Sequence, residues 1–175
     1  MFGLFRESGS RKRLANRLYA AIVQRARAPV FFTVFKVPDT IDGRFDLLAL
    51  HAWMVLDRLR DGKSAALSQD LVDAIFAGFD SALRDLGAGD MTIGRRIKAL
   101  ADAFYGRLEA YEACAEETDL SGAILRNLYR GDAARADCAA ALARHVREAR
   151  AQLDRADAEG GVLDFGPLPQ MEVTA

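Results

Sequence analysis

Residues 44–60 read RFDLLALHAWMVLDRLR, and this stretch decides the fold class. Phe45, Leu48, Ala52, Leu56 and Leu59 recur every three or four residues, which is the spacing of one face of an α-helix. Further apolar residues extend this face almost all round the helix: Leu47, Leu50, Met54 and Val55. Because a helix that is apolar on nearly every side is buried, we expect residues 44–60 to form the central helix, ended by Asp61-Gly62.

The flanking sequence also favours helices. No proline lies between Pro38 and Pro167, and alanine, leucine, arginine, aspartate and glutamate dominate that interval. We predict five further helices: about 10–28, Ser64 or Ser68 to Leu86, 93–111, a Thr118 cap to Gly131, and an Asp132 cap to 154. Residues 30–35 are short enough for a strand or a helical turn, and their helical neighbours favour the turn. The predicted fold is an all-α, single-domain orthogonal bundle of six to seven helices over 10–154, with a flexible N-terminus at 1–9 and a loose, acidic, Pro/Gly-containing tail at 155–175.

The composition argues against a disordered, a nucleic-acid-binding or a membrane-spanning protein. The chain has 175 residues, of which 51% are hydrophobic and 28% charged, so it folds as one domain and is not disordered. Lysine and arginine number 24 against 25 acidic residues, which gives no basic excess of the kind that nucleic-acid-binding proteins use, and we expect no sequence-specific nucleic-acid partner. The longest apolar run, residues 47–56, is half of the ~20 residues that a membrane span needs.

The first 30 residues are strongly basic, with seven lysines and arginines against Glu7. An arginine-rich, acid-poor start is typical of a transit peptide, but the spacing of Leu14, Leu18 and Ile22 favours a mature helix that packs on a core. Apolar and basic residues at the very start predict contact with anionic lipid through Phe2, Leu4, Phe5, Arg6, Arg11, Lys12 and Arg13.

No catalytic pattern is visible in the sequence. His51 lies in the most apolar helix, where a buried histidine is expected, and His145 is two helical turns from Cys138, too far to share a metal without other ligands. The remaining cysteine, Cys114, has no metal-ligand spacing either. Acidic residues are plentiful, yet none forms a carboxylate pair in an apolar environment. We therefore expect no enzyme activity, no metal and no cofactor.

Two clusters remain as candidate binding features. Phe31, Phe32 and Phe35 beside Lys36 form either a wedge that fills the core or an apolar patch for a partner. The basic residues of the 93–111 helix form either a solvated face or a site for phosphate or carboxylate groups, and they are Arg95, Arg96, Lys98 and Arg107.

Several motifs follow one another over about residues 14–130. They are Ala28-Pro29-x-Phe31-Phe32, Val37-Pro38-Asp39-Thr40-x-x-Gly43-Arg44-Phe45-Asp46-x-x-x-Leu50-His51, Asp73-Ala74-x-Phe76-x-x-x-Asp80, Leu86-Gly87-x-Gly89-Asp90, and Arg95-Arg96-x-Lys98 leading to Ala103-Phe104-Tyr105-Gly106-Arg107. In this order they resemble the ubiquinol–cytochrome c chaperone family, and the short N-terminus resembles a bacterial-type member.

The resemblance implies an assembly factor of the bc1 complex (respiratory complex III) that binds newly made cytochrome b, its client, without catalysis. Mitochondrial members do so near the ribosome and the membrane, with a small partner protein. The expected location is therefore cytoplasmic and peripheral at the inner membrane, or the matrix side in a eukaryote, next to ribosomes or insertion machinery. The residues that we predict to contact the client are Phe31, Phe32, Phe35, Lys36, Asp39, Arg44, Asp46, His51, Arg95, Arg96, Lys98 and Arg107.

Two other functions compete with this interpretation. The wide apolar face of the 44–60 helix would also suit a helical protein that binds a lipid or a small hydrophobic ligand. An enzyme would need a cluster of titratable groups that the sequence does not show.

Overall fold

The structure is a computed structural model that describes residues 2–61, 64–85, 87, 90–114, 117–158 and 160–171. The side chains of residues 2–7, 61, 90–92 and 117–119 lie outside the description. The predicted lipid contacts of Phe2, Leu4, Phe5 and Arg6, and the predicted helix end at Leu86, therefore fall outside the described residues.

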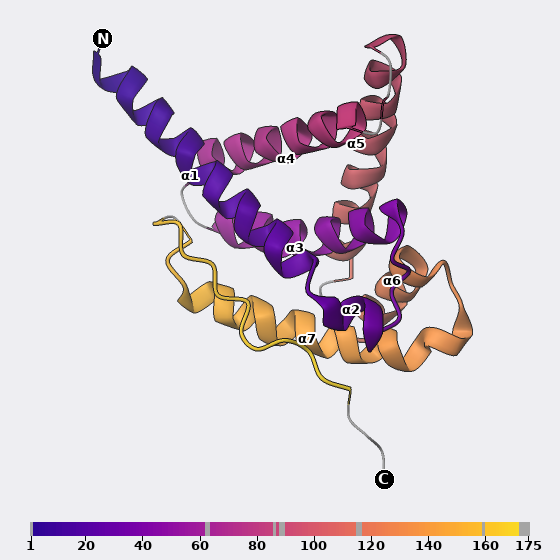
Figure 1. The fold of residues 1–175 in the computed structure, drawn as a ribbon. Coiled ribbons are helices and arrows are strands. Elements are labelled where there is room, and N and C mark those ends of the chain that lie inside the picture. The colour runs from indigo at the N-terminus through magenta and orange to yellow at the C-terminus, as the bar shows by residue number, and fades with distance from the viewer. Residues whose placement is uncertain are drawn as a thin grey trace.

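The described chain forms seven α-helices and one 3₁₀ turn, with no β-strand among the described residues. In chain order they are α1 (Phe2–Ala26), α2 (Pro29–Thr33), α3 (Ile41–Asp61), α4 (Ala65–Asp85), α5 (Asp90–Glu112), α6 (Glu117–Tyr129), η1 (Ala133–Arg135) and α7 (Ala136–Arg155). The helices cross one another instead of running parallel (Figure 1). The predicted all-α orthogonal bundle is confirmed.

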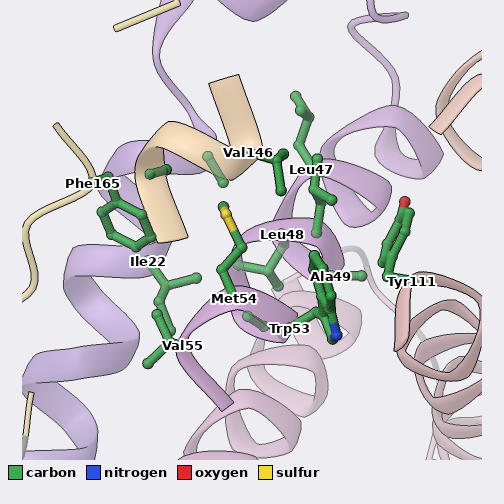
Figure 2. Close-up of a cluster of buried hydrophobic side chains, with 14 of the residues drawn as sticks. Ile22, Leu47, Leu48, Ala49, Trp53, Met54, Val55, Tyr111, Val146 and Phe165 are labelled. Carbon is green, nitrogen blue, oxygen red and sulfur yellow. The ribbon is translucent and has the colours of Figure 1, made fainter. Parts of the chain in front are cut away.

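The predicted central helix, α3, lies at the middle of the bundle and packs against α1, α4, α5, α6 and α7. Its residues 46–55 are all buried. Figure 2 shows side chains from other helices and from the tail around it: Ile22 of α1, Tyr111 of α5, Val146 of α7 and Phe165 of the tail. Each large apolar side chain buried in this way stabilises the fold by about 1.5–3 kcal/mol.

The N-terminus of α3 is fixed by a tight turn, and the helix begins three residues before the predicted Arg44. The Gly43 amide donates a hydrogen bond to the Thr40 hydroxyl oxygen at 3.1 Å, which satisfies one of the free amides of the first turn. At Gly43 itself an added Cβ would stand 2.0 Å from the Pro38 carbonyl oxygen, so only glycine fits against the preceding loop.

Several helix boundaries differ from those that the sequence predicts. Helix α1 begins at Phe2, eight residues before the predicted start at Ser10, so residues 2–9 continue the helix. It ends at Ala26, before Pro29, and the apolar segment that follows is helical as predicted. Thr118 lies inside α6 and is not its cap. Asp132 is predicted to cap the last helix, but its side chain accepts a hydrogen bond from the Ala134 amide and caps η1, and α7 begins only at Ala136, after Arg135.

The described part of the C-terminal tail is packed and not loose. After α7 the chain turns back along that helix (Figure 1), and Ala158 and Phe165 are buried. The Arg25 guanidinium donates hydrogen bonds to the carbonyl oxygens of Pro167 at 2.5 Å and Phe165 at 3.3 Å. The Phe165 ring stands edge-on to His51 at 5.6 Å. A loose tail is expected from the polar composition, but one aromatic anchor and one arginine are enough to hold it.

Candidate functional site: an apolar groove with arginines at its rim

A groove of about 380 Å³ opens on the surface between α1, α3 and α4. Most of its lining is aliphatic or aromatic, and the charged groups are two arginines and one aspartate. The lining residues are Tyr19, Val23, Ala26, Arg27, Ile41, Arg44, Phe45, Leu48, Gly78, Phe79, Ala82, Leu83, Asp85 and Leu100. A concave apolar surface with a few polar groups at its edge is the usual form of a binding site for an apolar partner or ligand.

The floor of the groove is built from the beginning of α3 and the second half of α4. The rings of Phe45 and Phe79 lie 5.4 Å apart, and the Phe79 ring also packs on Phe104. Ile41 is 67% exposed at the mouth, which is high for an isoleucine. These side chains leave an accessible apolar surface because no further element of the described chain covers the groove.

The wall next to α1 depends on a close approach of two helices. Gly78 of α4 faces Tyr19 of α1, and an added Cβ at Gly78 would stand 2.0 Å from the Tyr19 hydroxyl oxygen. This α1 wall, including Val23, was not predicted as part of a site. A glycine inside a helical pattern is the one signal in the sequence, but it is not specific, because Gly106 in α5 has the same pattern and meets nothing within 4 Å.

The rim is positively charged at Arg27 and Arg44. The Arg44 guanidinium donates a hydrogen bond to the Asp39 carboxylate at 2.6 Å and lies 5.7 Å from the centre of the Phe32 ring. The hydrogen bond from Arg44 lowers the pKa of the Asp39 carboxyl group. Because all three side chains are at least partly exposed, the predicted contact residues Phe32, Asp39 and Arg44 form one accessible patch beside the groove.

Four other predicted contact residues are buried, and contact with a client is a wrong prediction for them in this conformation. Phe31, Phe35, Asp46 and His51 are at most 1% exposed. Phe31 and Phe35 fill the core between α2 and α3, which was the alternative interpretation of the aromatic cluster. The Phe31 ring stands edge-on to His51 at 5.2 Å and lies 6.2 Å from His145.

The two histidines are neutral core residues. Burial lowers the pKa of His51 to about 3 and that of His145 to about 4. His51 Nδ1 lies 2.8 Å from the Leu47 carbonyl oxygen, one turn earlier in α3. The expectation of a buried histidine at position 51 is therefore confirmed.

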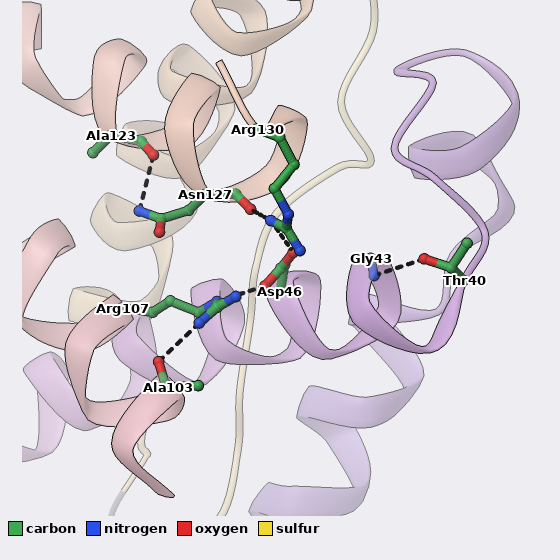
Figure 3. Close-up of polar contacts among 8 residues, drawn as sticks. All are labelled: Thr40, Gly43, Asp46, Ala103, Arg107, Ala123, Asn127 and Arg130. Atoms are coloured by element: carbon green, nitrogen blue, oxygen red, sulfur yellow. Dashed lines mark hydrogen bonds and ion pairs between the residues drawn. The ribbon is translucent and has the colours of Figure 1, made fainter. Parts of the chain in front are cut away.

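Asp46 supports the groove from inside the bundle (Figure 3). Arg107 Nε donates to one of its carboxylate oxygens at 2.5 Å, and Arg130 Nη1 lies 2.8 Å from the other. The Arg107 guanidinium also lies 4.8 Å from the centre of the Phe45 ring, which lines the groove. Burial raises the pKa of the Asp46 carboxyl group, and the two arginines oppose that shift. Arg107 is only 18% exposed, so it acts as an internal partner of α3 and not as a surface contact.

The remaining predicted basic contacts are exposed and spread over the surface. Arg95, Arg96 and Lys98 lie on the solvent side of α5, ahead of Leu100, which lines the groove. Lys36 is exposed in the loop after α2 and donates to the Thr33 carbonyl oxygen at 2.6 Å.

Of the predicted lipid contacts with described side chains, Lys12 and Arg13 are exposed. Arg11 instead donates to Asp70 of α4 at 2.5 Å, so its charge is paired within the protein.

Among the described residues, no group of three or more histidines, cysteines, aspartates or glutamates is placed to hold a metal ion. Across the described helices, none combines the length and the hydropathy that a membrane crossing requires.

Comparisons with known proteins agree with the resemblance. The chain is 25% identical over 118 residues to ubiquinol-cytochrome-c reductase complex assembly factor 1 of Xenopus laevis, covering 65% of this chain and 59% of the frog protein. The corresponding Drosophila melanogaster protein is 24% identical over 149 residues, covering 80% and 58%. The chain thus matches somewhat less than two thirds of these relatives' length.

The fold itself has a solved counterpart. The crystal structure of the Cbp3 homolog from Brucella abortus superposes with a TM-score of 0.79 at 34% identity, covering 95% of this chain and 96% of that one. The sequence profile described as Ubiquinol-cytochrome C chaperone matches residues 33–160, which include α3, α4, α5, α6 and α7. The chain therefore belongs to the ubiquinol-cytochrome C chaperone family.

Proposed function

We propose that this protein is an assembly chaperone of the bc1 complex that binds newly made cytochrome b and catalyses no reaction. The observation that carries the proposal is the apolar groove between α1, α3 and α4 with Arg27 and Arg44 at its rim. The names of the frog and fly relatives support the complex as the destination of the client.

A membrane-protein client needs its apolar helices shielded until they enter the bilayer. An open groove covers part of one helix and contributes roughly 25 cal/mol per Å² of apolar surface removed from water. Because the groove is open on one side and covers only part of a helix, this contribution favours a reversible complex. Arg27 at the rim favours client segments with acidic side chains next to the apolar face, whereas the Arg44 charge is already paired with Asp39.

The basic surface of α1 supports a position close to the membrane or to the ribosome that makes the client. Lys12 and Arg13 are exposed on α1. Each basic residue near an anionic bilayer adds about 1 kcal/mol of attraction. Peripheral binding at the inner membrane follows from this attraction and needs no spanning helix.

Site-specific photo-crosslinking in the native host tests the client site. A crosslinker replaces Ile41 at the mouth of the groove, and a matched crosslinker replaces the exposed Glu148 on α7. We expect cytochrome b adducts from position 41 and not from position 148. Adducts from both positions, or from neither, would contradict the groove as the client site.

A pair of substitutions on α4 tests the function in the cell. Ala82→Phe fills the groove, whereas Ala77→Phe places the same ring on an exposed position of α4 that does not line it. We expect bc1 levels to fall with the first variant only. If A82F left bc1 levels unchanged and the purified protein carried a bound lipid, the groove would instead belong to a lipid-binding protein.

A further inference from the structure

A second cleft, larger than the groove, lies between α3, α4 and α5 and has a volume of about 690 Å³. On α3 its lining begins at Trp53, whereas the lining of the apolar groove ends at Leu48. The two depressions share no lining residue. They are therefore separate surfaces toward opposite ends of α3.

The three helices present the same pattern to this cleft. Each contributes four residues at positions i, i+3, i+4 and i+7, starting from Trp53 in α3, Ala65 in α4 and Tyr105 in α5. Two turns with this spacing form the stripe that one helix packs against another. Three such stripes facing one space are the arrangement found around a further helix in a bundle. The cleft thus has the form of a vacant helix position.

The centre of the cleft is apolar and aromatic. Leu56, Val72 and Leu108 come from the three different helices. Tyr105 is 46% exposed at the edge, whereas Trp53 is only 2% exposed and lies in the wall beneath the surface. An exposed tyrosine beside an apolar centre is typical of the residues that dominate binding energy at protein interfaces.

The polar edge of the cleft carries an excess of negative charge. Its lining includes three carboxylates but only one arginine. Arg60 pairs with both Asp57 and Glu112, the latter at 2.7 Å, and Arg150 of α7 also pairs with Asp57. Within the described part of the chain, Glu109 has no ion-pair partner, and it is exposed next to Leu108. An incoming cation is favoured at this carboxylate.

We propose that the cleft binds one amphipathic α-helix of a partner protein. The partner's apolar stripe enters between α3, α4 and α5, and its lysine or arginine side chains flank that stripe and pair with Glu109. Binding of this kind follows the helix-in-groove mode, with anchors at i, i+3 or i+4 and i+7. The inference does not rest on the client groove, because it uses different residues.

Intrinsic fluorescence reports changes beside the cleft, since Trp53 is the single tryptophan of the chain and its ring, 2% exposed, lies in the cleft wall. The probe is a 14-residue peptide of leucine and lysine with leucines at helical i, i+3, i+4 and i+7 positions. A control peptide carries glutamate in place of every lysine. We expect saturable change of Trp53 emission with the Leu/Lys peptide and at least about tenfold weaker binding of the Leu/Glu peptide.

Two charge-reversal variants distinguish binding of the peptide in the cleft from its non-specific electrostatic attraction to the protein surface. Glu109→Lys changes the edge of the cleft, and Glu148→Lys makes the same change on an exposed position of α7. We expect E109K to weaken the peptide about tenfold and E148K to change its affinity by less than about twofold. Equal weakening by both variants, equal binding of both peptides, or no change of Trp53 emission would overturn the proposal. The groove variant A82F should bind the Leu/Lys peptide with the affinity of the unmodified protein. The peptide experiment therefore tests the cleft alone, and the bc1 levels of A82F test the client groove alone.

Discussion

The carboxylate of Asp46 in α3 and the guanidinium of Arg107 in α5 form an ion pair at 2.5 Å inside the bundle, with Asp46 completely buried. Arg130, just after α6, approaches the other carboxylate oxygen at 2.8 Å. Asp46, Arg107 and Arg130 together join three segments directly behind Phe45, which lines the apolar groove.

Loss of the Asp46 carboxylate should destabilise the fold strongly. Asp46→Ala leaves the partly buried Arg107 without its anion, and we expect a loss of about 3 kcal/mol in the free energy of unfolding, measured by urea denaturation. Asp39→Ala removes the exposed partner of Arg44 and serves as the control, with little change in the urea midpoint. Similar losses for the two variants would show that burial of the Asp46 pair does not matter.

Gly43 should not tolerate a methyl group. The Cβ of Gly43→Ala would stand 2.0 Å from the Pro38 carbonyl oxygen, so the turn before α3 must move, and we expect about 3 kcal/mol of destabilisation. Gly106→Ala in α5 meets nothing within 4 Å and should stabilise the protein by up to about 1 kcal/mol. Thermal unfolding followed by circular dichroism compares the two. A G43A protein as stable as the unmodified chain would contradict the close contact.

The protein should lose stability as the pH falls below 7. Both His51 and His145 have folded-state pKa values, about 3 and about 4, below the ordinary value of 6.5. The unfolded chain therefore takes up protons first, and each histidine removes up to about 1.4 kcal/mol of stability per pH unit below 6.5.

Urea denaturation at pH 7, 6 and 5 measures this effect above the range in which most carboxylates titrate. The variant His145→Phe keeps an aromatic ring without a titrating group, and its unfolding free energy should fall less steeply between pH 6 and 5. A slope as steep as that of the unmodified protein would exclude His145 as a source of the acid sensitivity.

Phe165 of the C-terminal tail should keep water away from the His51 ring. Phe165→Ala removes a buried ring that covers His51, and we expect a loss of about 3 kcal/mol and an upward shift of the His51 pKa. Titration followed by NMR reads the pKa, and urea denaturation reads the stability. Leu168→Ala, at a position that is 45% exposed, is the control and should change neither quantity appreciably. An unchanged His51 pKa in F165A would mean that the ring does not exclude water.

The sequence by itself determined the helical class and the central helix. The apolar residues of 44–60 recur with a helical period, and their number on every side requires burial whatever the neighbours are. The glycine at position 43 and the prolines at 29 and 38 act on the backbone next to them, so their effects are also local. The short apolar segment after Pro29 is predicted as a helical turn because its neighbours are helical, and α2 confirms this over Pro29–Thr33.

Only the tertiary structure decided which side chains face a partner. Asp46 is joined to Arg107 across 61 positions of sequence, and Arg25 is joined to Pro167 across 142. No local pattern reports such pairs, so the sequence predicts that Asp46 contacts the client and that the tail is loose. The groove likewise forms where α1 meets α3 and α4, and Tyr19 becomes part of it only because Gly78 lets the two helices approach. Periodicity shows that a face is apolar, but what covers that face depends on contacts between segments that are far apart in the chain.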